Sequence, residues 1–458
     1  MAFKYNPPTR SFCEVCEKIA KKKKNAIINT SNGRASSANN FPFHNWYNFV
    51  LGYSPEFPEY IINKNSINSK HLIVDPFMGT GTTLISAKKN KIKSAGIDAN
   101  DYFIDVAKTK LNWDLDLNEI RDLKIKILDK LHKKLSSIDF ENISQPQKSS
   151  ISKKQKIKFR NYLEKNKIEF LDSRYISERP LCKLIILKKI LKKEVPENLR
   201  DFFNLALSSI LVNVSNIRYG PGFGVTKPKE DADVLNIFNL KLERMMADIS
   251  TNPNLNNTEA NVYHGDAREL DKIFKKSSID YMITSPPYPG DHEYTKHTKL
   301  ELIFMDYANS LSDFRVIKKR MLRGSTTNIY KEDNDKEQIQ EIKSIQEITK
   351  LIDQRLKDDN ATSGFEKLYT KLVWEYFGGM YKVFVSAKKV LKKGGKFSLL
   401  VSDSHAFKMV HIKTADILAE VALKAGFGEF EIDLWQHKTS TSHKYDLNEN
   451  ILTIKKID

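Results

Sequence analysis

The tetrad Ser285-Pro286-Pro287-Tyr288 directly follows an apolar run at residues 279–283, and this arrangement leaves few folds open to the chain. A short apolar run before a turn is typical of a buried strand in a parallel sheet. Two consecutive prolines donate no backbone hydrogen bond and hold φ near its extended value, so the chain leaves the strand rigidly. We therefore expect the tetrad at the carboxyl end of a strand, the edge where open α/β sheets bind ligands.

The chemistry of the tetrad suits an amino group on an aromatic base. The backbone carbonyls point outward beside the Ser285 hydroxyl, which makes a rigid row of hydrogen-bond acceptors. Acceptors on both N–H groups of such an amine hold it pyramidal and aim its lone pair at an electrophile. Tyr288 would then stack on the base. Taken alone, the tetrad is equally compatible with an ordinary Pro-Pro turn after a strand.

A second segment contains a strand, a glycine turn and a helix. Residues 72–75 form an apolar strand that runs into Gly79-x-Gly81, and a helical pattern continues from residue 84. Glycines let a ligand approach the backbone closely, and the helix offers free N–H groups. A further short strand ends at Asp98, 23 residues after Asp75, a usual spacing for a carboxylate that binds ribose hydroxyls. No third glycine completes the dinucleotide fingerprint, so the pattern favours a nucleoside ligand without a pyrophosphate.

Together these motifs resemble the amino-directed DNA methyltransferases, which use S-adenosylmethionine to methylate N4 of cytosine or N6 of adenine. The resemblance implies an α/β fold, namely a Rossmann-like methyltransferase sheet with helices on both faces, antiparallel closing strands and helical insertions. It gives the catalytic residues as Ser285, Pro286, Pro287 and Tyr288. It gives the cofactor-binding residues as Asp75, Phe77, Gly79, Gly81, Thr82, Asp98 and Asp266.

The resemblance also favours a target base and a mechanism. Serine before Pro-Pro favours cytosine, which would be flipped out of the duplex and held by Ser285 and the Pro286 carbonyl. The absence of a cysteine near the tetrad argues against methylation of ring carbon 5. The chain departs from the family in one respect, because cytosine-N4 enzymes often carry Ser-Pro-Pro ahead of the cofactor motif. An enzyme acting on adenine N6 or on RNA, and a nucleic-acid-binding protein without turnover, remain as alternatives.

The charge of the chain favours an anionic partner. Lys and Arg number 75 against 57 Asp and Glu, a net charge of +18. A general lysine bias of the source would look the same. We expect double-stranded DNA as the partner, and the resemblance suggests a functional pairing with a restriction endonuclease. The candidate nucleic-acid contacts are Arg218 in a Gly-Pro loop, Tyr294 and Lys296 after the tetrad, and Arg320 and Arg323 in a basic, hydroxyl-rich patch.

Targeting and cysteine content point to the cytoplasm. No run of about eighteen apolar residues occurs and the N-terminus lacks a signal-peptide core, so we expect a cytoplasmic protein without a membrane partner. Three cysteines are too few for a disulfide framework. Cys13-x-x-Cys16 has no second Cys or His pair at a convincing spacing, so we expect no metal.

At 458 residues the chain exceeds the usual size of one domain. The predicted parts are a basic polar arm (1–40), a cofactor-binding part (41–114), a helical basic insertion and candidate for target recognition (115–200), a core part with the tetrad (201–304), a second insertion (305–370) and a C-terminal core part (371–458). We expect helices at 102–111, 115–135, 161–191, 202–214, 233–249, 336–357 and 372–391, a loop at 216–224, and strands at 261–264, 397–401, 430–435 and 450–454.

Overall fold

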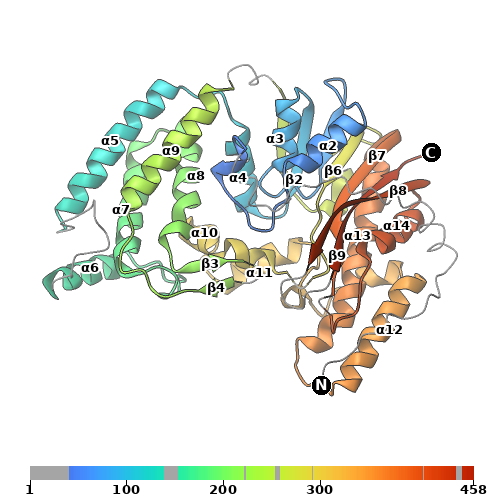
Figure 1. The fold of residues 1–458 in the computed structure, drawn as a ribbon. Helices are drawn as coiled ribbons and strands as arrows, with labels where there is room; N and C mark the ends of the chain where they lie inside the picture. The colour runs from blue at the N-terminus through green and yellow to red at the C-terminus, as the bar shows by residue number, and fades with distance from the viewer. Residues whose placement is uncertain are drawn as a thin grey trace. The chain divides into compact units, whose positions relative to one another are not determined.

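A computed structural model describes residues 41–138, 153–220, 223–252, 258–290, 292–405, 407–439 and 446–458 (Figure 1). The predicted arm with Cys13 and Cys16 lies outside the described residues, and so do residues 139–152 of the predicted basic insertion. The chain divides into two compact units. The N-terminal unit comprises the described residues up to Ala267 together with Glu293–Met321, and the C-terminal unit comprises Arg268–His292 and Leu322–Asp458.

The strands of the N-terminal unit run in the order β5-β2-β1 and pair in parallel. They are β1 (Leu72–Asp75), β2 (Lys93–Asp98) and β5 (Ala260–His264). Asp98 pairs in register with His264, so these two strands end together. The carboxyl ends of all three strands therefore meet at one edge, which is where the cofactor motif was expected to lie.

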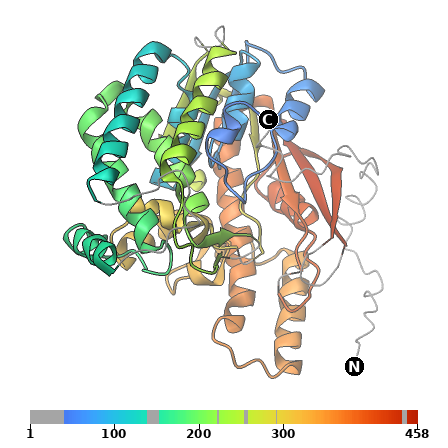
Figure 2. The ribbon, with the colours of Figure 1, turned by 60° about the vertical axis from the view of Figure 1, so that its left-hand side comes forward.

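The N-terminal unit contains most of the helices. They are α2 (Glu56–Lys64), α3 (Thr82–Lys89), α4 (Asp101–Leu111), α5 (Leu117–Ser136), α6 (Lys153–Lys165), α7 (Glu178–Glu194), α8 (Glu197–Val214), α9 (Val234–Ser250), α10 (Lys299–Phe304) and α11 (Leu311–Arg320). Helices α5, α7, α8 and α9 pack against one another, as both ribbon views show (Figures 1 and 2). On α5 the buried residues Ile120, Ile127, Leu131 and Leu135 form one apolar stripe, which explains why this charged helix joins the core.

Two predictions for this unit were wrong in detail. The helix expected at 161–191 is interrupted between α6 and α7. There the Asp172 carboxylate accepts the backbone N–H of Arg174 at 2.9 Å, a local hydrogen bond that competes with helix formation. The loop expected at 216–224 contains an antiparallel hairpin made of β3 (Ile217–Tyr219) and β4 (Phe223–Val225).

The strands of the C-terminal unit run in the order β6-β7-β9-β8. They are β6 (Ile279–Thr284), β7 (Leu391–Ser402), β8 (Glu429–Thr439) and β9 (Asp446–Lys455). β6 and β7 pair in parallel, whereas β9 is antiparallel to both β7 and β8, so the predicted closing strands are confirmed. Ser285 directly follows β6, as the apolar run predicted.

The helices of the C-terminal unit are α12 (Lys343–Asp358), α13 (Tyr369–Val390) and α14 (Thr414–Lys424). The helix predicted from residue 336 begins only at Lys343, because Asp335–Gln338 forms a 3-10 turn against α13. With seven mostly parallel strands flanked by helices, the predicted α/β, Rossmann-like class is confirmed. Within the described ranges, no helix is long and apolar enough to cross a membrane.

Candidate active site

Asp75 at the end of β1 shapes the turn that follows it. Its carboxylate is fully buried and accepts the backbone N–H of Phe77 at 3.0 Å through Oδ1. Oδ2 accepts the hydroxyl of Tyr53 at 2.8 Å, and Tyr53 also contacts Thr83 at 2.5 Å. Tyr53 belongs to the aromatic segment before β1, and no motif marked it as a partner of Asp75. Asp75 thus fits a supporting role under the turn better than direct contact with a ligand.

The glycine turn leaves an open surface at Gly79. Gly79 and Gly81 have φ values of +50° and +85°, which glycine adopts without strain. A side chain at Gly81 would meet Ala107 Cβ at 3.3 Å, whereas a Cβ at Gly79 would have no atom within 4 Å. Thr82 then begins α3. A ligand can therefore approach the backbone at Gly79, which is the close approach that the sequence predicted.

Asp98 lies at the end of β2 and is held by the glycine turn. Its Oδ2 accepts the Gly79 N–H at 2.9 Å and its Oδ1 accepts the Asn100 N–H at 2.9 Å. Burial raises the pKa of Asp98 to about 7, although both backbone donors favour the ionised form. The Gly265 N–H donates to the Asp98 carbonyl at 3.0 Å, so the partly buried Asp266 lies at the same edge. Two carboxylates beside an open glycine turn fit the hydroxyls and ring of a nucleoside.

The tetrad is fixed by side chains and by the neighbouring strand. Ser285 Oγ lies 3.0 Å from the carbonyl oxygen of Leu400 on β7 and 3.1 Å from the hydroxyl of Tyr288. The Gly290 N–H donates to the Tyr288 carbonyl at 2.8 Å, which closes the turn after the tetrad. Pro286 is buried and Pro287 is partly buried. Ser285 and Tyr288 are therefore brought together as one unit.

Three polar residues near the tetrad were missed by the sequence analysis. Glu449 on β9 is 4% exposed and lies 3.4 Å from the Tyr288 hydroxyl. Lys438 on β8 donates to Glu449 at 2.5 Å, and Gln436 also donates to this carboxylate. The only signal in the sequence is a set of polar residues inside otherwise apolar closing strands, and such residues have many structural explanations.

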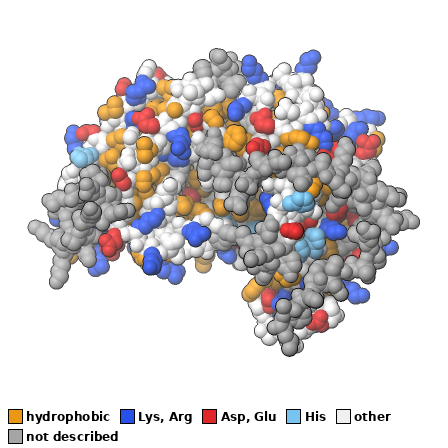
Figure 3. Space-filling model, in the orientation of Figure 1, with side chains coloured by type: hydrophobic (Ala, Val, Ile, Leu, Met, Phe, Trp, Pro, Cys, Tyr) orange, Lys and Arg blue, Asp and Glu red, His pale blue; other side chains and the backbone are white. Residues whose placement is uncertain are grey.

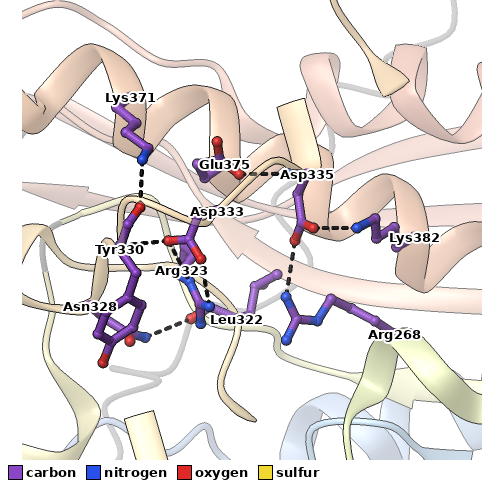
Figure 4. A network of polar contacts seen from close by, with 10 residues as sticks. All are labelled: Arg268, Leu322, Arg323, Asn328, Tyr330, Asp333, Asp335, Lys371, Glu375 and Lys382. Carbon is purple, nitrogen blue, oxygen red and sulfur yellow. Dashed lines mark hydrogen bonds and ion pairs between the residues drawn. The ribbon is translucent and has the colours of Figure 1, made fainter. Parts of the chain in front are cut away.

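Residues 322–338 form a strap that packs beside the tetrad. A Cβ placed on Gly324 would lie 3.5 Å from the Tyr288 carbonyl oxygen and 3.6 Å from Pro287 Cβ. Arg323 donates to both carboxylate oxygens of Asp333, at 3.0 and 2.8 Å (Figure 4). Arg323 is 6% exposed, so its guanidinium is committed to this buried ion pair. This geometry argues against the predicted contact of Arg323 with nucleic acid and favours a role in holding the strap.

The other end of the strap is tied to α13. Asp335 receives hydrogen bonds from Arg268 at 3.0 Å and from Lys382 at 2.5 Å, and its backbone N–H donates to buried Glu375 at 2.8 Å (Figure 4). A Cβ on Gly378 would lie 2.3 Å from the Asp335 backbone, so the strap packs against α13 too closely for any side chain at residue 378. The strap is therefore a packed wall next to the tetrad.

The remaining predicted nucleic-acid contacts lie on separate elements of the N-terminal unit. Arg218 is exposed on β3, Lys296 is exposed in the 3-10 turn Tyr294–Thr298, and Tyr294 is partly buried against Phe49. The Arg320 side chain is 40% exposed, 2.9 Å from His264. Among the described residues on the face drawn in Figure 3, Lys and Arg side chains lie interspersed with acidic and hydrophobic ones. The contacts of these residues with nucleic acid stay predictions.

Comparison with known proteins gives matches that each cover less than a fifth of the chain. Residues 29–109 match a family model described as DNA methylase, the N6_N4_Mtase family. The chain is 39% identical over 59 residues to the Type II methyltransferase M.BsoBI of Geobacillus stearothermophilus, which is 13% of this chain and 12% of that protein. It is 37% identical over 81 residues to the Type II methyltransferase M.MjaII of Methanocaldococcus jannaschii, which is 18% of this chain and 14% of that protein.

The family match falls on the part of the site that the glycine turn forms. It includes β1, Gly79, Gly81 and Asp98, whereas the tetrad lies beyond the matched residues. Each match covers less than a sixth of the relative's own length. The family match therefore bears on the glycine turn and leaves the tetrad to be judged by its chemistry.

Proposed function

We propose that the chain is an amino-directed (N6/N4) DNA methylase, the family whose model residues 29–109 match, and that it transfers a methyl group from S-adenosylmethionine to an exocyclic amino group of duplex DNA. Cytosine N4 is the first candidate because serine precedes Pro-Pro in the tetrad. The observation that carries the proposal is the Asp98 carboxylate held by the Gly79 N–H at 2.9 Å beside open space at Gly79. The two relatives are Type II methyltransferases, which supports a role beside a restriction endonuclease.

The N-terminal unit would bind the cofactor. When bound, S-adenosylmethionine supplies a methyl group that its sulfonium makes electrophilic. Asp98 would accept the ribose hydroxyls, and Asp266 would contact the adenine. Gly79, Gly81 and Phe77 would line the cofactor, and Thr82 would present the first turn of α3.

The C-terminal unit would hold the target base. Ser285 Oγ and the Pro286 carbonyl would accept the two N–H groups of the amine and orient its lone pair, while the Tyr288 ring would stack on the base. Flipping the base out costs a few kcal/mol, which stacking and phosphate contacts offset. Positioning supplies most of the catalysis, so the residues need only bind and orient the amine.

The proposal is tested by methyl transfer from labelled S-adenosylmethionine to mixed-sequence duplex DNA, followed by hydrolysis and identification of the nucleoside. Ser285→Ala is the test variant. Ser278→Ala is the matched control, because Ser278 lies just before the same strand and its hydroxyl donates to the nearby Lys275 carbonyl at 2.7 Å. We expect N4-methylcytosine with wild type and Ser278→Ala and a loss of about 100-fold with Ser285→Ala. Wild-type protein that binds the cofactor and labels no DNA would contradict the proposal.

Adenine N6 is the second candidate. The cofactor motif precedes the tetrad in this chain, an order that departs from many cytosine-N4 enzymes. If the same assay yields N6-methyladenine, methyl transfer to an amino group is supported and cytosine as the target base is contradicted.

A further inference from the structure

The Tyr288 hydroxyl lies between two acceptors of different strength. It is 3.1 Å from Ser285 Oγ and 3.4 Å from Glu449 Oε1. The Ser285 hydroxyl in turn has the Leu400 carbonyl at 3.0 Å. Since each hydroxyl carries one proton, the direction of these hydrogen bonds decides how many lone pairs Ser285 keeps for a substrate.

The charge on Glu449 favours one of the two directions. A carboxylate accepts more strongly than a neutral hydroxyl, which offsets the longer distance to Glu449. When Tyr288 donates to Glu449 and Ser285 donates to Leu400, both lone pairs on Ser285 Oγ remain available. When Tyr288 donates to Ser285 instead, one of these lone pairs is already used.

Glu449 is itself held firmly by the closing strands. Lys438 donates to Oε1 at 2.5 Å and Gln436 donates to Oε2, both from β8. In the sheet register Gln436 and Ser402 lie on either side of Glu449, which fixes the glutamate backbone. Burial of a carboxylate is costly unless such partners are present. Glu449 is paired with Lys438 and faces the tetrad as an acceptor.

We propose that Glu449 is a positioning residue that holds the Tyr288 phenol and turns its proton away from Ser285, so that Ser285 can accept an N–H of the target amine. This inference rests on the proposed function, since it deepens the role of the same tetrad. Glu449 contacts Tyr288, and through that residue it would act on the amine.

A double-mutant cycle tests the proposal, because an effect that passes through the Tyr288 hydroxyl must vanish when this hydroxyl is absent. The variants are Glu449→Gln, Tyr288→Phe and their combination, assayed for kcat and for KM of S-adenosylmethionine and DNA. We expect Glu449→Gln to lower kcat roughly tenfold in the wild-type background and less than twofold in the Tyr288→Phe background. KM for S-adenosylmethionine should stay unchanged. Equal losses in both backgrounds would overturn the proposal.

Two further variants separate positioning from folding. Glu429→Gln is the matched control, because Glu429 pairs with Lys455 at 3.1 Å at the far end of the same strand pair, and its kcat should equal that of wild type. Glu449→Gln/Lys438→Gln removes both charges together, so it avoids an unpaired charge if Glu449→Gln alone fails to fold. The double-charge variant should show the same dependence on the Tyr288 hydroxyl.

Crystal structures of wild type and Glu449→Gln give a readout that does not need turnover. We expect the Tyr288 hydroxyl to move away from residue 449 in the variant, whatever the substrate of the enzyme is. Wild type that methylates no DNA would contradict the proposed function, and the inference would then be decided by these structures. An unchanged Tyr288 would overturn the inference even with a fully active enzyme.

Discussion

The two parts of the candidate site are built from different kinds of contact. In the N-terminal unit, backbone N–H groups of Phe77, Gly79 and Asn100 hold the carboxylates of Asp75 and Asp98. In the C-terminal unit, the tetrad is held mainly by side chains, which extend from Ser285 through Tyr288 to Glu449 and Lys438.

This difference predicts which substitutions change cofactor affinity and which change the rate of methyl transfer. Backbone donors are fixed by the turn itself, so the cofactor motif depends on its carboxylates and on glycines that permit its geometry. A side-chain network depends on every member and on the elements packed beside it. We therefore expect substitutions in the N-terminal unit to change cofactor affinity or stability, and substitutions around the tetrad to change the rate of transfer.

The largest effect is expected where the strap meets α13. A Cβ at Gly378 would lie 2.3 Å from the Asp335 backbone, which cannot rotate away as a side chain can. Gly378→Ala should lower the free energy of unfolding by about 3 kcal/mol, at the upper end for overpacking. Urea denaturation measures this loss. Gly364→Ala, which meets no atom within 4 Å, is the matched control and should be near neutral. Equal stability of both variants would contradict the close contact.

Glu301 is a second buried glutamate that accepts hydrogen bonds from tyrosines, and it can be compared with Glu449, which also pairs with Lys438. Glu301 is 1% exposed and accepts the hydroxyls of Tyr47 and Tyr219, each at 2.9 Å. Burial raises the pKa of Glu301 to about 7. Because the folded protein favours protonated Glu301, this group contributes to the free energy of unfolding. The contribution is fully present below pH 4.5, the ordinary pKa of the carboxyl in the unfolded chain, and it is lost as the pH rises through the folded-state pKa of about 7. Between pH 5 and pH 8, wild type should lose on the order of 2 kcal/mol relative to Glu301→Gln.

Urea denaturation of wild type and Glu301→Gln between pH 5 and pH 8 measures this difference in the free energy of unfolding. Because Asp98 also titrates near pH 7, the difference between wild type and Glu301→Gln isolates the contribution of Glu301. Parallel curves for the two proteins would show that Glu301 is already ionised at pH 5.

The pKa of Asp98 predicts a pH-dependent affinity for the cofactor. An ionised carboxylate accepts hydrogen bonds from ribose hydroxyls, and Asp98 titrates at about 7 in the free protein. Because the ionised fraction falls about tenfold from pH 8 to pH 6, the Kd for S-adenosylmethionine should rise about tenfold. Titration calorimetry at both pH values measures it. Asp98→Asn should bind more weakly with little pH dependence, and a steep pH dependence in that variant would assign the titration to another group.

The smallest effect is expected from alanine substitutions at two glycines that both have positive φ values. Gly79 and Gly394 have φ values of +50° and +79°, and at neither site would a Cβ have an atom within 4 Å. Alanine at either site should cost about 1 kcal/mol of stability through the left-handed conformation. Only Gly79→Ala should also weaken cofactor binding, by a few-fold, because its methyl group enters the open surface beside Asp98. Equal cofactor affinity in the two variants would remove Gly79 from the binding surface.

Local patterns predicted the parts of the fold that local forces determine. The strand before the tetrad, the strand before the glycine turn and the turn itself follow from neighbouring residues, and β6, β1 and the positive φ values at Gly79 and Gly81 agree. The resemblance to the amino-directed DNA methyltransferases was recognised from the same motifs, and the family model matches residues 29–109.

Contacts between distant residues could not be predicted in this way. Glu449 follows Tyr288 by 161 residues and reaches it only because β9 pairs with β7. Arg323 looked like a surface cation in the sequence, yet Asp333 pairs with it in the buried strap. Both outcomes depend on tertiary packing, for which a single sequence carries no local signal.

The measurement that tests the account most directly is single-turnover methyl transfer to DNA with S-adenosylmethionine titrated against wild type, Asp98→Ala and Ser285→Ala. We expect Asp98→Ala to raise the half-saturating cofactor concentration about 100-fold with a maximal rate near that of wild type. We expect Ser285→Ala to keep the half-saturating concentration and lower the maximal rate about 100-fold. If both variants changed the same parameter, or if Ser285→Ala transferred methyl groups at the wild-type rate, the division of binding and transfer between the two parts would be contradicted.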